Sequence, residues 1–149
     1  MASTSSLNTL IELTKNGADK IGKLLNQLTT ERNNAEAQLS TLHVYRLDYA
    51  ERLLKATETG LSASNYQNFR QFIATLDEAI SQQNRIVAQM NVKIEQGRQQ
   101  WFAEKRRLSS FEALQTRQTH QQQIRNNRLE QLASDEVSAN LYRRAHYVH

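Results

Sequence analysis

Apolar side chains recur at alternating spacings of three and four residues through the second half of the chain. This spacing is typical of the a and d positions of a heptad repeat. The sequence contains no proline, so no proline interrupts the repeat. The pattern predicts one long helix over about residues 65–135. Its apolar seam consists of Tyr66, Phe69, Ile73, Leu76, Ile80, Val87, Met90, Ile94, Trp101, Leu108 and Phe111.

A second amphipathic segment precedes the first and predicts another long helix over about residues 6–58. Its seam is less regular, because polar residues or glycine also fall on it and weaken the packing. We therefore expect some looseness in this helix. The apolar a and d positions are Leu7, Leu10, Ile21, Leu24, Leu28, Leu42 and Tyr49, with Ile11, Leu25, Leu39 and Leu53 beside them, and the weak positions are Thr14, Gly17, Glu31 and Gln38.

A short connection over about residues 59–64 joins the two predicted helices. Gly60 suits the left-handed C-cap conformation, and Ser64 with Gln67 matches a capping box at the start of the second helix. A connection this short favours antiparallel packing of the two apolar stripes. The predicted fold is all-α: an antiparallel coiled-coil hairpin of two long helices, in which the second overhangs the first. We expect a single coiled-coil domain over residues 1–149, with a frayed tail at 136–149.

The hairpin has a predictable register. Folding the chain about Ser62 pairs residues whose numbers sum to roughly 123, which places Leu42 near Ile80 and Trp101 opposite Gly22. The same arithmetic pairs Leu7 with about residue 116, so the end of the second helix has no partner within the chain. The seam also becomes polar there, which suggests a segment that another molecule orders. Its positions are Gln115, Gln118, Gln122 and Arg125, followed by Leu129 and Leu132.

The composition fits a thin seam better than a thick core. Apolar residues make up 38% of the chain and the mean hydropathy is -0.72. The absence of cysteine excludes disulfides and zinc-thiolate sites. The first residues lack the pattern of a signal peptide, and no apolar run approaches the length of a membrane span, so we expect a soluble protein.

The positive charge is concentrated in the last third of the chain. Residues 98–149 hold nine Lys and Arg against five Asp and Glu, whereas residues 1–97 hold ten of each. This end therefore suits an acidic partner, although a solvated helix face is an equal alternative. The basic stretch comprises Arg98, Lys105, Arg106, Arg107, Arg117, Arg125 and Arg128.

No motif indicates catalysis. The segment from Gly17 to Lys23 matches the glycine and lysine spacing of a phosphate-binding loop, but Leu24 follows where Ser or Thr is required. The segment also lies within a predicted helix, whose amides are already bonded. The four histidines, His43, His120, His146 and His149, are scattered, and only the last two share a helical face. We expect no enzyme activity, cofactor, metal or small-molecule substrate.

Most aromatic residues are interpreted as seam packing. Phe102 is the exception, because it adjoins Trp101 and both cannot face the first helix. It is a candidate contact for a partner. Near the turn, Phe72 lies at a g position and, with Tyr45 and Tyr49, could form a docking face.

Several strings resemble the FliJ family of flagellar type III export proteins. The most specific is the segment from Tyr66 to Ile80, and off-seam residues such as Gln71 and Thr75 agree as well as the heptad positions. Trp101, residues 104–108, residues 114–119 and the pair Tyr45 and Tyr49 extend the match over most of the chain in order.

This resemblance implies a cytoplasmic stalk, similar to the γ subunit of rotary ATPases, at the cytoplasmic face of the inner membrane at the flagellar base. It implies three partners: the hexameric export ATPase FliI, the export gate protein FlhA and export chaperones. The positions that match the family's gate-binding surface are Gln38, Leu42, Tyr45, Tyr49, Phe72, Leu76, Ala79 and Gln83, the last replacing a histidine of the family. From the overhang and its charge, we assign the ATPase-facing role to Arg106, Arg107, Arg117, Arg125 and Arg128.

Three alternatives remain at this point. The chain could be the equivalent stalk of a virulence injectisome, or a scaffold that self-associates through its overhangs. Nucleic-acid binding through the basic helix is a third, although the basic run lacks the charge density and base-stacking platforms of such proteins, so we expect no nucleic acid.

Overall fold

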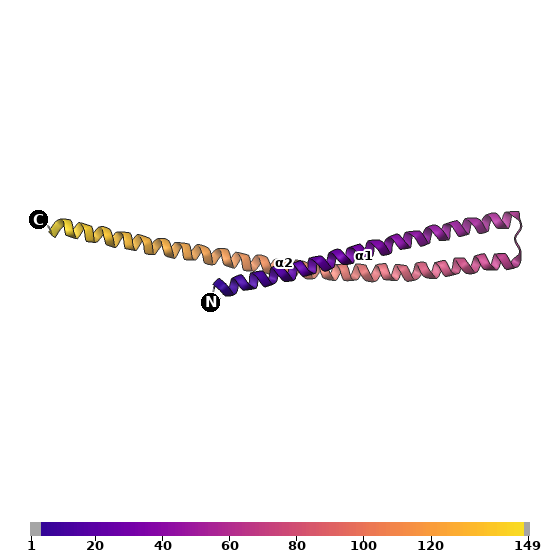
Figure 1. Ribbon diagram of the computed structural model, residues 1–149, viewed down its shortest axis with the longest axis horizontal. Helices are drawn as coiled ribbons and strands as arrows, with labels where there is room; N and C mark the ends of the chain where they lie inside the picture. The colour runs from indigo at the N-terminus through magenta and orange to yellow at the C-terminus, as the bar shows by residue number, and fades with distance from the viewer. Residues whose placement is uncertain (1–3, 148–149) are drawn as a thin grey trace. The chain divides into compact units, whose positions relative to one another are not determined.

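The computed structural model describes residues 4–147, which form two helices (Figure 1). Helix α1 spans Thr4–Thr59 and helix α2 spans Ala63–Tyr147. The described residues contain no strand, and the fold is the predicted antiparallel helical hairpin. Helix α2 continues twelve residues beyond the end that the sequence pattern predicts near 135. It does so because no glycine or proline follows Gly97 to stop it. Residues 148–149 of the predicted frayed tail lie outside the described residues.

The connection is shorter than predicted and is capped by a different serine. Gly60 has a φ of 95°, the left-handed conformation expected at the end of α1. The hydroxyl oxygen of Ser62 accepts a hydrogen bond of 3.2 Å from the amide of Asn65, and the carbonyl of Ser62 accepts one of 3.0 Å from Tyr66. Ser62 is therefore the N-cap, and the predicted capping box of Ser64 with Gln67 is wrong. The two-residue offset arises because several serines in this stretch satisfy the same composition rule.

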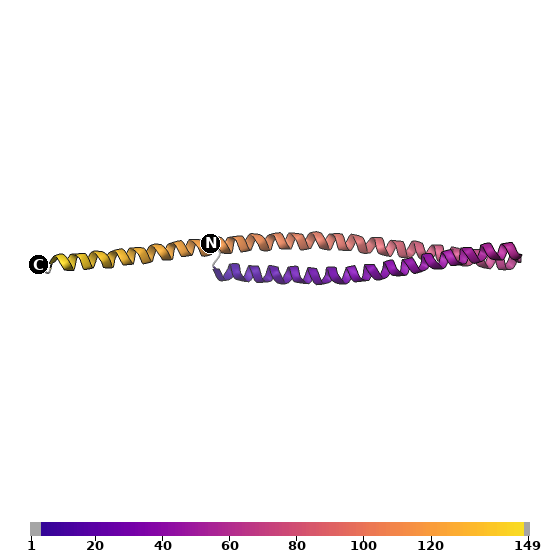
Figure 2. The ribbon, with the colours of Figure 1, turned by 90° about the horizontal axis from the view of Figure 1, so that it is seen from above.

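Contacts divide the hairpin into two compact units, where the sequence predicts a single coiled-coil domain. Each unit contains one segment of each helix. The first consists of Ala18–Phe102 and includes the connection; the second consists of Met1–Gly17 and Ala103–His149, of which residues 4–17 and 103–147 are described. Figures 1 and 2 show α1 and α2 side by side from the connection onward within the first unit.

The first unit confirms the predicted register. Arg32 donates a hydrogen bond of 3.5 Å to Asn91, and the ion pair between Arg46 and Asp77 has the same residue-number sum. Gly22 lies against the indole of Trp101: a Cβ added to this glycine would be 3.6 Å from Nε1. The missing side chain thus leaves space for the largest residue of the seam.

The seam of α1 differs in part from the prediction. Leu10 and Leu24 are exposed, whereas Ile11 is buried and Leu25 contacts the backbone of α2 at Gly97. A Cβ added to Gly97 would lie 2.8 Å from Cδ2 of Leu25, so the helices approach closely there. Apolar residues occupy adjacent positions at 10–11 and 24–25, and spacing alone could not choose between them.

The second unit contains a small apolar cluster and a long extension of α2. Leu7, Ile11 and Leu108 are buried together, and Phe111 packs against them. At the end of this contact, the amide of Gln115 donates a hydrogen bond of 2.6 Å to Asn8, again in the predicted register. Thr4 faces residue 119 in this register. Residues 120–147 of α2, here called the overhang, therefore face no described residue of α1, and residues 120–146 are exposed.

Candidate functional site

Eight predicted residues lie on the two helices near the connection and are here called the turn-proximal face. They differ in how much of their side chains they expose. Gln38, Tyr45 and Phe72 are exposed, Tyr45 by 53%, whereas Leu76 is buried at 7%. Leu76 therefore packs in the seam, where a partner could reach little of it. The other four, Leu42, Tyr49, Ala79 and Gln83, are half-buried.

Aromatic rings join the two helices across this face. The ring of Tyr49 lies 4.3 Å from that of Phe72 and 6.3 Å from that of Phe69, measured between centroids. The guanidinium of Arg52 lies 5.4 Å from the Tyr49 ring. Tilted ring pairs of this kind stabilise packing. Tyr49 thus holds the face together, and the more exposed Tyr45 presents its ring to solvent.

Two polar seam residues bond to each other across the hairpin. The side-chain amide of Gln83 donates hydrogen bonds of 3.0 Å to the carbonyl of Ala35 and 3.1 Å to Oε1 of Gln38. The sequence predicts weakness at Gln38, but this pairing satisfies the polar atoms and fixes the register locally. It also brings together two of the eight predicted residues.

An ion pair lies beside this face and was not anticipated from the sequence. Nε of Arg46 on α1 pairs with a carboxylate oxygen of Asp77 on α2. The hydrogen bond from Arg46 lowers the pKa of Asp77, and the hydrogen bond and charge of Asp77 raise the pKa of Arg46. Both side chains are exposed, so the pair contributes little to stability and mainly selects the register. The sequence does contain a signal for this ion pair: the numbers of Arg46 and Asp77 sum to 123, the value that predicts the apolar contacts between the helices.

An exposed apolar stripe on α1 lies outside the predicted seam and the predicted docking face. Val44, Leu47 and Leu54 recur at spacings that place them on one side of the helix, and each exposes 63% of its surface. They are not seam residues. A shallow depression lined by Ala37, Gln38, Thr41 and Leu42 lies on the same helix.

The predicted ATPase-facing arginines all lie on α2 and are exposed. Arg107 is held by its neighbours: its guanidinium lies 3.3 Å from Glu104 and 5.9 Å from the ring of Phe111. The heptad positions are f and g for Arg106 and Arg107, c for Arg117, and d and g for Arg125 and Arg128. Because f, c, g and d are consecutive positions around the helix, the five positive charges share one side of α2.

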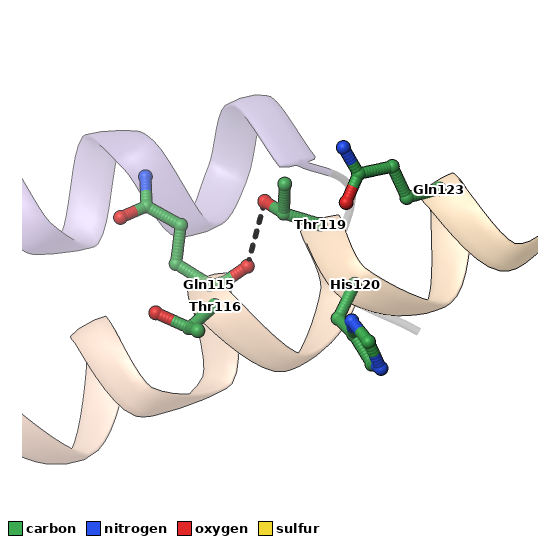
Figure 3. Close-up of a pocket in the computed structure, with 5 residues that line it drawn as sticks. All are labelled: Gln115, Thr116, Thr119, His120 and Gln123. Carbon is green, nitrogen blue, oxygen red and sulfur yellow. Dashed lines mark hydrogen bonds between the residues drawn. The ribbon is translucent and has the colours of Figure 1, made fainter.

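A polar hollow marks the start of the overhang. It is lined by Gln115, Thr116, Thr119, His120 and Gln123, all from α2 (Figure 3). The hydroxyl of Thr119 donates a hydrogen bond of 2.9 Å to the carbonyl of Gln115, the bond drawn in Figure 3. The hydroxyl is thus occupied within its own helix, and the hollow is a surface depression between successive turns.

The other candidates from the sequence fall outside any cluster. The glycine-lysine segment from Gly17 to Lys23 is helical. His146 stacks against Tyr142 at 4.1 Å, and His149 lies outside the described residues. Residues 4–147 contain no group of three or more potential metal ligands. Among the same residues, no helix has the length and apolar character of a membrane span. Phe102 is exposed by 49%, as predicted, with its ring edge-to-face against Trp101.

Comparison with known proteins gives consistent matches over nearly the whole chain. Residues 3–146 match the family described as Flagellar FliJ protein. A Flagellar FliJ protein from Salmonella typhi is 32% identical over 138 residues, which cover 93% of this chain and 94% of the relative. The Flagellar FliJ protein of Escherichia coli strain K12 is 31% identical with the same coverage.

Proposed function

Because this chain belongs to the flagellar FliJ protein family, we propose that it is a component of the flagellar export apparatus that couples the export ATPase to the export gate. It acts as a stalk without catalysis of its own, at the cytoplasmic face of the inner membrane, and it also handles export chaperones. The two relatives are flagellar proteins, which favours the flagellum over the injectisome.

The observation that carries this proposal is the exposed overhang, which faces no described residue of α1. The five ATPase-facing arginines lie before the overhang and within it, at the neighbouring positions f, c, g and d on one side of α2. This basic side suits an acidic surface of a partner. We therefore assign α2 from Arg106 to the end of the overhang to the hexameric ATPase.

Truncation tests this assignment. A chain that ends at Thr119 retains the Leu7, Leu108 and Phe111 cluster but lacks the overhang. We expect it to keep the helicity of the hairpin in circular dichroism and to bind the purified ATPase at least about tenfold more weakly. A full-length chain with Arg117, Arg125 and Arg128 changed to Gln separates charge from length: its binding should weaken and lose salt dependence. Unchanged binding by the truncated chain would contradict the assignment.

We assign the turn-proximal face to the gate protein. Its exposed members, Gln38, Tyr45 and Phe72, supply two aromatic rings and a side-chain amide. Because Tyr49 packs against Phe72, its removal would lower stability as well as binding. Tyr45 gives the cleaner test.

We expect Tyr45→Ala to weaken binding of the purified gate cytoplasmic domain by at least about tenfold, as loss of an exposed aromatic anchor does. The thermal midpoint should change little, because the side chain is half exposed. Val44→Ala is the matched control, since Val44 adjoins it and is also exposed, but faces another direction. Equal effects of the two substitutions would show that Tyr45 is not a specific contact.

A further inference from the structure

Four charged residues of the overhang have no oppositely charged residue three or four positions away. In the hairpin, arginines bind carboxylates three or four residues away: Arg52 lies 3.1 Å from Asp48, and Arg107 lies 3.3 Å from Glu104. Arg125 and Arg128 have no carboxylate at those spacings, and Asp135 and Glu136 have no Lys or Arg. Within residues 4–147, these four side chains form no ion pair with one another.

These charges are arranged symmetrically about the middle of the overhang. The seam positions there are Gln122, Arg125, Leu129, Leu132, Glu136 and Ala139, which lie at matching distances on either side of the midpoint between residues 130 and 131. An antiparallel pair of identical helices places each a position opposite a d position of the other. Leu129 of one copy then faces Leu132 of the other, and Arg125 faces Glu136.

The flanking positions follow the same symmetry. In an antiparallel pair, g residues face g residues, which brings Arg128 of one copy to Asp135 of the other. Because a two-fold axis repeats every contact, four opposite-charge pairs surround four leucines. Leu129 and Leu132 expose 65% and 62% of their surfaces in the single chain, so this pairing covers apolar area that the hairpin leaves uncovered.

The first helix limits this pairing to a defined length. Helix α1 begins at Thr4, opposite residue 119 of α2, so the pair of overhangs can begin only at residue 120. In the two-fold symmetric pair, residue 120 of one copy faces residue 141 of the other, which sets the other end. The shared segment therefore covers residues 120–141, or about 33 Å of helix. All six seam positions named above lie inside it. The remaining residues of α2, 142–147, fall outside the pair.

We propose that two copies of this chain associate through their overhangs as an antiparallel, two-fold symmetric helix pair centred between residues 130 and 131. This self-association goes beyond the stalk function. A parallel pair is disfavoured because it would oppose Arg125 to Arg125 and Glu136 to Glu136. Four leucines, two ion pairs at seam positions and two at flanking positions make a weak interface, so the full-length protein exists as monomer and dimer in equilibrium.

Sedimentation equilibrium of the full-length chain tests this pairing. Over about 1–300 µM, the range in which weak complexes dissociate, the average mass should rise from monomer to dimer. The variant R125E/R128E opposes acid to acid and should dissociate at least about tenfold more readily. The control R117E/R144E changes the net charge equally but lies at the outward c and b positions, and should dimerise like the original chain. A chain that stays monomeric throughout, or equal effects of the two variants, would overturn the proposal.

A charge swap tests the antiparallel orientation. The chain with R125E/R128E and D135R/E136R restores every pair within its own dimer, so self-association should return. It should not associate with the original chain, because the mixed antiparallel pair opposes like charges at every charged contact. A parallel pair has the reverse preference. In a parallel mixed dimer, Arg125 of the original chain would face the Glu that replaces it in the variant, so the mixed dimer would form more readily than either homodimer. Mixed dimers in a mass-tagged experiment would therefore overturn the antiparallel arrangement.

Discussion

The glycines on the two sides of the hairpin differ in what an added methyl group would meet. At Gly22 it would lie 3.6 Å from Trp101, an ordinary van der Waals contact, whereas at Gly97 it would lie 2.8 Å from Leu25. Within a helix, alanine is more stable than glycine by about 0.5–1 kcal/mol. We expect Gly22→Ala to raise the free energy of unfolding by that amount in urea titration. Gly97→Ala should gain less or nothing, because Leu25 must shift. Equal gains at both positions would contradict the close approach.

Single contacts were predictable where a position had one apolar choice. The pairing of Trp101 with Gly22 follows from the fold-back point alone and is confirmed. The choice between Leu24 and Leu25 was not predictable, because either satisfies the three-four spacing. The bond from Gln83 to Gln38 was also hidden. In a heptad pattern, glutamine at a seam position indicates weak packing. The pattern does not predict that the side chains of Gln38 and Gln83 are close enough to form a hydrogen bond.

At the scale of the helices, the cap of α2 gives a direct test. Ser62 accepts the hydrogen bond from the amide of Asn65, so Ser62→Ala leaves that amide without its protein partner. We expect a loss of about 1 kcal/mol in the free energy of unfolding, typical of a lost N-cap. Ser64→Ala serves as the control and should be nearly neutral, because Ser64 is exposed within the helix. If the Ser64 substitution costs more in thermal unfolding, the cap has been assigned to the wrong residue.

Helix boundaries were predictable where the sequence contains stop signals. Gly60 ends α1 within one residue of the expected position, because its positive φ suits glycine and few other residues. The end of α2 had no such signal. After Gly97 neither glycine nor proline occurs, and the helix continues to Tyr147, past the end near residue 135 that the declining apolar pattern predicts. Local backbone rules, not seam quality, set where this helix stops.

For the whole molecule, the sequence predicts the overhang and only part of the turn-proximal face. The overhang follows from a count of residues on either side of the turn, which is robust because the helices contain no proline. The positions of Phe72, Tyr45 and Tyr49 predict a docking face, whereas the other five residues of the face follow only from family resemblance. Their exposure is a three-dimensional property: Leu76 and Tyr45 are both seam-related by pattern, yet one is buried and the other is open.

The two proposed uses of the overhang require the same charges, which makes them mutually exclusive. Arg125 and Arg128 cannot pair with a second copy while an acidic surface of the ATPase contacts them, so each partner must weaken the other by the same factor. The chain has no cysteine, so Ser134→Cys at an outward f position accepts a single dye. Energy transfer between donor-labelled and acceptor-labelled copies should report the dimer and fall to the level of R125E/R128E as purified ATPase hexamer is added. Transfer that persists at saturating ATPase would show that the dimer binds intact and that the overlap of the two surfaces is wrong.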